Sequence, residues 1–122
     1  MRGTLGRSDI GDEEVDAFVD RNVISFAAWD LLAYLSQNTS GSHTIADLTH
    51  LLSRADSDVE PVVARLSESG VLVPGEHRGE PTYRLTDDPA VRDVLARFVA
   101  ASTRREYRLE FVRRVLGQIT GA

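Results

Sequence analysis

The sequence predicts a mainly α-helical protein that carries one small β-hairpin. Apolar residues recur every three or four positions over most of the chain, which is the period of helices with one buried face. One stretch, 71–86, instead has two short β-prone runs separated by proline and glycine, as two strands joined by a turn would have. The length of 122 residues and the hydrophobic content of 42% suit one domain with a modest core.

The first half of the chain opens with three predicted helices. Residues 1–11 are polar and are expected to be a flexible N-terminus, followed by a short helix over 12–20. Ser25 is a good N-cap for a core helix, which continues until a polar run breaks it. Thr44, with Asp47 three residues later, opens a further helix of about ten residues.

A fourth helix follows, the third of the core helices. It opens at Ser57 or Asp58, and Pro61 favours Asp58 as the N-cap. The missing N–H of the proline then falls among the N–H groups that have no helical partner. Gly70 is placed as the glycine that ends this helix in a left-handed conformation.

A hairpin and a C-terminal helical arm complete the chain. The strands are expected at 71–73 and 82–86, with a loose turn between them. Asp88-Pro89 is typical of a helix start. Polar residues near Thr103 interrupt the apolar stripe of the arm, which leaves open one long helix or two consecutive ones. The predicted organisation is a flexible segment at 1–11, a domain over 12–87 and an arm over 88–122.

Composition narrows the classes of protein and site. Cysteine is absent, which excludes disulfides and thiolate metal sites and favours a reducing compartment such as the cytoplasm. No apolar segment is long enough to span a bilayer, so a soluble protein without membrane contact is expected.

His43, Asp47 and His50 share a helical spacing, but three such residues are too few for a convincing metal site. Neither a metal nor a cofactor is expected, and no catalytic motif indicates an enzyme.

Charge is distributed unevenly along the chain. The net charge is −5. Residues 1–70 hold five Arg against twelve Asp and Glu, whereas residues 71–122 hold nine Arg against seven Asp and Glu. Because a DNA duplex attracts basic surfaces, any nucleic-acid contact is expected to depend on the later part of the chain, meaning the hairpin and the arm.

The segment 44–86 carries a family resemblance. Its order is helix, turn, helix and hairpin, after a first core helix. The most specific part is the spacing of Val59, Val63, Leu66, Gly70, Val71 and Leu72, followed by Tyr83-Arg84-Leu85-Thr86. This part resembles the passage from recognition helix to wing in winged helix-turn-helix regulators of the bacterial MarR, ArsR and PadR kinds. The resemblance implies a transcription regulator that binds duplex DNA as a homodimer.

The resemblance also implies a set of DNA-contacting residues at the end of the second core helix, on the third core helix and on the hairpin. These are Arg54, Ser57, Arg65, His77 and Arg78. Asp58, Glu60 and Glu68 lie on the same helix, where they would oppose phosphates. The alternative is therefore a winged-helix protein-interaction module whose acidic third helix binds a basic partner. A third hypothesis is an effector-sensing fragment whose partner domain lies elsewhere.

The apolar stripe of the arm predicts a dimerisation surface. It is longer than one small helical core can cover, and exposed apolar patches mark interfaces. The residues expected at the dimer interface are Val91, Leu95, Phe98, Leu109, Val112, Leu116 and Ile119.

Overall fold

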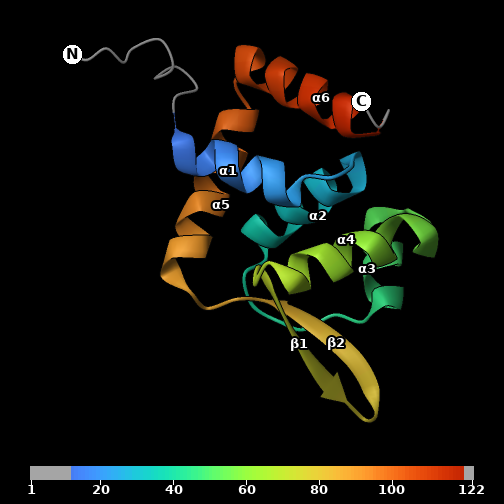
Figure 1. Ribbon diagram of the computed structural model, residues 1–122. Coiled ribbons are helices and arrows are strands. Elements are labelled where there is room, and N and C mark those ends of the chain that lie inside the picture. The colour runs from blue at the N-terminus through green and yellow to red at the C-terminus, as the bar shows by residue number, and fades with distance from the viewer. Residues whose placement is uncertain (1–11, 120–122) are drawn as a thin grey trace.

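The computed structural model describes residues 12–119, which form a mainly helical fold with one antiparallel hairpin (Figure 1). The elements in chain order are α1 (Glu13–Asn22), α2 (Phe26–Gln37), α3 (Ile45–Leu52), α4 (Asp56–Glu68), β1 (Leu72–His77), β2 (Glu80–Leu85), α5 (Pro89–Ser102) and α6 (Arg105–Ile119). The predicted mainly helical class with a small hairpin is confirmed. The predicted flexible segment 1–11 lies outside the described residues. No helix among residues 12–119 is long and apolar enough to cross a membrane.

Short-range capping signals define the predicted helix starts. The Ser25 hydroxyl accepts a hydrogen bond from the Ala28 amide at the start of α2. Thr44 and Asp47 form a reciprocal capping box at α3, with both hydrogen bonds at 3.0 Å. Asp88 caps α5 ahead of Pro89, as predicted. Each of these caps acts within three residues, which is why the sequence alone locates them.

The start of α4 differs from the prediction. The helix begins at Asp56, and its N-cap is Ala55, whose side chain makes no capping hydrogen bond. The amides of Asp58 and Val59 both bond to the Ala55 carbonyl, so the first turn forms before the expected cap. Pro61 therefore lies inside the helix and not in its first turn. Because proline has no N–H, Pro61 cannot donate to the carbonyl four residues earlier. That carbonyl lies on an exposed turn, where water can donate to it instead.

The hairpin is longer and tighter than predicted. Only Arg78 and Gly79 join the strands, and both have positive φ (55° and 82°), as a type I′ turn requires. The expected loose turn over 74–81 is wrong because Pro74 and Pro81 belong to the strands. The register pairs Pro74 with Tyr83 and Glu76 with Pro81, at alternate positions where the backbone nitrogen points out of the ladder. The two prolines thus cost no hydrogen bond between the strands.

A further backbone contact attaches the hairpin to the helices. His43, just before α3, pairs with Tyr83 of β2 through two backbone hydrogen bonds of 2.9 and 2.8 Å. This bridge lies on the side of β2 away from β1 and fixes the base of the hairpin beside the start of α3. One bridging residue has no periodicity of its own, so no pattern in the sequence predicts it.

The arm consists of two helices, and α6 folds back over α2 (Figure 1). Phe98 of α5, Phe111 of α6 and Trp29 of α2 form an aromatic cluster, with ring centroids 5.2 to 6.0 Å apart. Phe98 and Phe111 are fully buried. The core therefore includes both helices of the arm.

The face of α6 that packs on the chain is not the predicted stripe. Phe111 and Val115 are buried, whereas Leu109, Leu116 and Ile119 are exposed by 56%, 48% and 54%. The predicted stripe assumes that the helical repeat of α5 continues without interruption into α6. The chain instead breaks between the two helices near Thr103, so the repeat starts anew and a different side of α6 faces the core. Periodicity alone could not reveal this because two apolar faces are available on α6.

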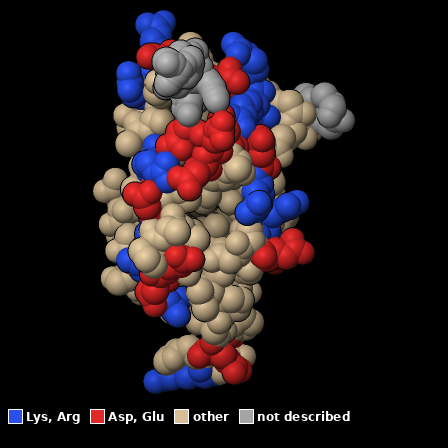
Figure 2. All heavy atoms as spheres, turned by 60° about the vertical axis from the view of Figure 1, so that its left-hand side comes forward, with Lys and Arg blue, Asp and Glu red and all other residues tan. Residues whose placement is uncertain are grey.

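Ion pairs attach α1 to both helices of the arm. Arg97 of α5 bonds to Asp12 and Glu14, and Arg114 of α6 bonds to Asp16 and Asp20. Figure 2 shows acidic and basic side chains close together over the upper half of this face. The acidic edge of α1 is thus neutralised by arginines that lie more than eighty residues later in the chain.

We predict that Asp12→Asn lowers stability at pH 7 by roughly 0.5–1 kcal/mol, as for a partly exposed ion pair. Asparagine still caps α1, so the change isolates the charge. Burial alone would raise the pKa of Asp12, but hydrogen bonds from Arg97 and the Val15 amide lower it below the ordinary 3.8. The stabilisation is complete above pH 3.8 and is lost as the pH falls through the lower folded-state pKa.

Urea unfolding at pH 7 and at pH 3 checks this expectation. The difference in unfolding free energy between wild type and variant should be present at pH 7 and smaller at pH 3. An equal difference at the two pH values would show that the carboxylate charge is not responsible.

Candidate nucleic-acid interface

The candidate interface consists of α3, α4 and the hairpin, which lie at the end of the molecule away from α6 (Figure 1). One side of α4 is buried against the core through Val59, Val62, Val63 and Leu66. The opposite side of the helix faces solvent. Gly70 follows α4 with φ of +86°, which confirms the predicted left-handed glycine and turns the chain into β1.

Four of the five residues expected to contact DNA lie on exposed parts of this interface. Ser57 and Arg65 are exposed on α4, and His77 and Arg78 are exposed at the end of the hairpin. Among the described residues, neither Arg65 nor Arg78 has an ion-pair partner. Arg78 also occupies the first position of the type I′ turn, so its side chain leaves the outermost point of the hairpin.

Arg54 is the fifth expected residue, and the structure gives it an internal partner. Its Nε and Nη2 atoms donate to Asp30 Oδ2 of α2 at 2.9 and 2.7 Å. The side chain keeps only 31% of its surface exposed. This pair joins the loop after α3 to α2, so a DNA contact by Arg54 would compete with the carboxylate it already holds.

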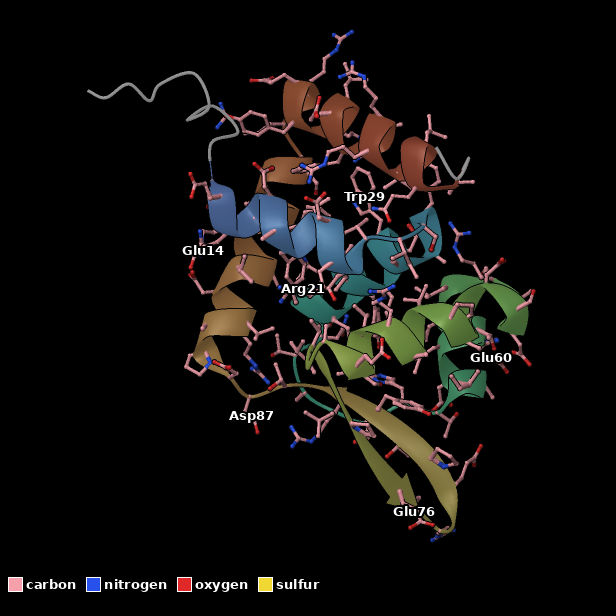
Figure 3. The ribbon with its side chains drawn as sticks, viewed as in Figure 1. Glu14, Arg21, Trp29, Glu60, Glu76 and Asp87 are labelled. Carbon is pink, nitrogen blue, oxygen red and sulfur yellow. The ribbon has the colours of Figure 1, made fainter. Side chains whose placement is uncertain are left out.

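Carboxylates outnumber these arginines on the same surface. Asp56, Asp58, Glu60 and Glu68 are exposed on α4, and Glu76 and Glu80 flank the hairpin turn. In Figure 3, Glu60 projects outward from α4 and Glu76 lies near the end of the hairpin. None of these six carboxylates has an ion-pair partner within residues 12–119. The surface therefore has negative potential broken by two isolated cations.

The arginines of the arm do not reinforce this surface. Arg114 is bound to Asp16 and Asp20, and Arg113 pairs with Glu110. Arg108 lies over the Trp29 ring, with 5.6 Å between its guanidinium carbon and the ring centroid. Figure 1 places α6 and the hairpin at opposite ends of the molecule. The expectation that arm and hairpin arginines act together is not met by this arrangement.

A groove between α3, α4 and the hairpin was not anticipated from the sequence. Its volume is about 430 Å³, and its walls include Ile45, Val63, Ala64, Pro74 and Tyr83. Glu60 stands at its side. The groove exists because the His43–Tyr83 bridge holds the hairpin beside α3, and the residues that form it come from three separate elements. No local sequence signal could have indicated it.

His43, which forms the bridge to Tyr83, also makes a polar contact with Tyr34. The Tyr34 hydroxyl lies 3.3 Å from His43 Nε2, while His43 Nδ1 is buried without a hydrogen-bond partner in the described structure. Within residues 12–119, no group of three His, Cys, Asp or Glu side chains is arranged to hold a metal ion. His43 lies in the bridge to Tyr83, outside α3, so it does not share the helix of Asp47 and His50.

Comparison with known proteins yields no relative from which a role can be transferred. No family model matches this chain, and neither a curated protein nor a solved structure is detectably similar to it. Any functional assignment therefore depends on the geometry and charge of the chain's own residues.

We predict that Gly79→Val destabilises the hairpin by about 1–2 kcal/mol, the cost of a left-handed conformation for a residue with a Cβ atom. No atom lies within 4 Å of a Cβ built on Gly79, so the effect is conformational and not a clash. Amide hydrogen exchange of β1 and β2 should accelerate. Gly117→Ala is the control because its added Cβ also meets open space, without a positive φ. Equal exchange rates in wild type and Gly79→Val would contradict the type I′ turn.

Proposed function

We propose that this chain is a winged helix-turn-helix transcription regulator that binds duplex DNA as a homodimer in the cytoplasm. One observation carries the proposal: the exposed side of α4 and the end of the hairpin each present an arginine that has no ion-pair partner among the described residues. In this assignment α4 is the recognition helix and the hairpin is the wing. The backbone bridge between His43 and Tyr83 holds the wing beside the start of α3.

Each element has a distinct task in the proposed complex. Ser57, at the exposed beginning of α4, and Arg65, two turns later, face the major groove. Arg78 reaches a phosphate or the adjacent minor groove from the wing, where the turn separates it from the body of the protein. His77 lies beside it and adds a second polar contact. The proposal contains no catalytic step and requires neither a metal nor a cofactor.

The acidic side chains determine the expected character of binding. Carboxylates on α4 repel phosphates, so affinity depends on a small number of arginine contacts to the backbone. Such contacts position a protein but do not distinguish sequences. Binding is therefore expected to be weak at physiological salt and strongly dependent on ionic strength.

The proposed dimer uses the outer face of α6. Leu109, Val112, Leu116 and Ile119 follow the alternating spacing of a coiled-coil seam, and three of them are about half exposed. Leu95 and Phe98 are buried within the single chain, and Val91 is half-buried on α5. The surface available to a second copy is thus narrower than the full predicted stripe. Two α6 helices packed along this seam leave both wings free at the far ends.

A second candidate function is favoured by the six carboxylates on α4 and around the hairpin turn that lack ion-pair partners in the described structure. A winged-helix protein-interaction module would use this acidic surface to bind a basic protein partner. The groove beside Glu60 would then accept an apolar side chain from that partner. The two functions require opposite effects from the same charges, so one titration separates them.

We predict that Asp58→Asn combined with Glu60→Gln tightens duplex binding roughly five- to thirtyfold, because each carboxylate near a phosphate costs on the order of 0.5–1 kcal/mol. Arg78→Asn should weaken binding to every sequence and reduce the salt slope by about one unit. Asparagine tolerates the left-handed conformation, so the turn is retained. Fluorescence anisotropy with one labelled duplex at several salt concentrations measures both effects.

The matched control is Glu106→Gln combined with Glu110→Gln on α6. It removes the same number of charges at the other end of the molecule and should leave duplex affinity nearly unchanged. Unaltered affinity in the Asp58 and Glu60 variant would mean that α4 does not face DNA. A basic peptide that binds wild type but not this variant would favour the protein-partner function.

We predict that Leu116→Glu converts the dimer to a monomer, because it places two like charges in an apolar seam. Light scattering at tens of micromolar measures the molar mass. Leu51→Glu on α3 is the control, since Leu51 is also about half exposed but lies outside α6. A wild-type chain that is monomeric under these conditions would overturn the dimer proposal.

A further inference from the structure

The groove between α3, α4 and the hairpin has the size and the lining of a site for a side chain of another protein. Its volume is about 430 Å³. Pockets of roughly 300–1,000 Å³ hold whole small molecules, so this groove has room for at least one large side chain. The apolar part of its lining consists of Ile45, Val63, Ala64, Pro74 and Tyr83. The groove therefore suits an apolar group.

Carboxylates accompany this apolar lining. Glu60 of α4 lines the groove and is exposed, and Glu76 lies two residues beyond Pro74 on β1. Neither carboxylate has an ion-pair partner within residues 12–119. Among the described residues that line the groove, none is basic. The complementary ligand is an apolar group that carries positive charge beside it.

One polar group at the groove lacks a hydrogen-bond partner. Ser67 lines the groove one turn after Val63, and its Oγ is buried with no partner among residues 12–119. Buried hydroxyls are normally hydrogen-bonded, because burial without a partner costs free energy. A peptide chain that enters the groove brings carbonyl acceptors, which the hydroxyl reaches by rotation about one side-chain bond. This unused donor is a second feature, separate from the charges, that a bound chain satisfies.

The hairpin excludes one mode of docking, the addition of a strand to its edges. At Pro74 and Pro81 the backbone nitrogen points away from the neighbouring strand, and proline has no N–H to offer there. The edge of β2 is also occupied in part, because Tyr83 already bonds to His43. Each outer edge therefore lacks a donor that an added strand requires. Recognition of a partner at this groove then depends on side chains.

We propose that this groove binds a basic segment of a partner protein and holds one large apolar side chain of it, leucine or phenylalanine, that lies between arginine or lysine residues. The apolar anchor fills the groove, and a neighbouring basic residue pairs with Glu60. The Ser67 hydroxyl donates to a carbonyl of the bound segment. This inference rests on the protein-interaction function given above as the second candidate. It does not depend on duplex binding, which is assigned to Arg65 and Arg78.

The test is a titration of the full chain with the capped peptide Lys-Arg-Phe-Arg-Lys and with its leucine counterpart, followed by NMR shifts of the backbone amides. Saturable shifts should centre on the start of α3, residues 60–67 and the hairpin. The peptide with alanine at its centre should bind at least tenfold more weakly, because it buries no large apolar group. The peptide Glu-Glu-Phe-Glu-Glu should not bind. Binding by only one of the two anchors supports the proposal and identifies the anchor.

Two pairs of variants assign the effect to the groove. Glu60→Gln should weaken binding of the basic peptides about fivefold, as for loss of one exposed ion pair. Glu68→Gln removes the same charge from an exposed position of α4 outside the groove lining and should have a much smaller effect. Ala64→Leu adds volume at the groove and keeps every charge, so it should weaken binding tenfold or more. Ala46→Leu, on the exposed side of α3, is its control.

Two further variants separate this site from folding and from duplex binding. Ser67→Ala removes a hydroxyl that has no partner in the described structure, so it should be at least as stable as wild type in urea yet bind the peptides more weakly. Arg78→Asn, which should weaken duplex binding, should leave peptide affinity nearly unchanged. Absence of saturable binding by both basic peptides at millimolar concentrations, or equal affinity of wild type and Ala64→Leu, would overturn the proposal and leave the duplex measurements unaffected.

Discussion

Trp29, Phe98 and Phe111 pack together between α2, α5 and α6, and the arrangement of both ends of the molecule follows from this contact. Because Phe98 and Phe111 belong to successive helices, their contact requires α6 to reverse direction and lie over α2. The reversal turns Leu109, Leu116 and Ile119 outward. It also carries the arm away from α4 and the hairpin, so that the exposed leucines of α6 and the exposed side of α4 lie at opposite ends of the fold (Figure 1).

The same reversal explains why the basic half of the chain does not form a basic surface. Once α5 and α6 lie beside α1, Arg97 and Arg114 meet the acidic residues at the start of the described chain. A charge count along the sequence treats these arginines and carboxylates as free. In the folded chain, ion pairs between distant segments neutralise them, so they contribute little to the surface potential. What remains near the hairpin is the local excess of carboxylates.

Local signals in the sequence located most of the fold. Ser25, Thr44 and Asp88 mark helix starts through contacts with their own next turn, and Gly70 marks a helix end through its own φ. Most errors arose where distant contacts decide the outcome. The N-cap of α4 is two or three residues too late in the prediction, and the strands extend through Pro74 and Pro81 because pairing fixes their register. The buried face of α6, with Phe111 and Val115, was not predicted because it is defined by packing on distant elements. Exposure of Ser57, Arg65, His77 and Arg78 agrees with expectation, but the Asp30 partner of Arg54 could not be foreseen from spacing.

The carboxylates of α4 and of the hairpin do not all have the same structural role. Asp56 and Asp58 lie in the first turn, where negative charge is favourable to the helix dipole, so folding alone accounts for them. Glu60 and Glu68 lie beyond that turn, and Glu76 and Glu80 flank a type I′ turn whose conformation depends on Arg78 and Gly79. These four glutamates have no comparable local role, so their charges act mainly on whatever approaches Arg65 and Arg78. On a DNA-binding face they would suppress non-specific association with phosphate, and in a protein interface they would attract the partner. The sign of their effect on duplex affinity is therefore the physical quantity that distinguishes the two functions.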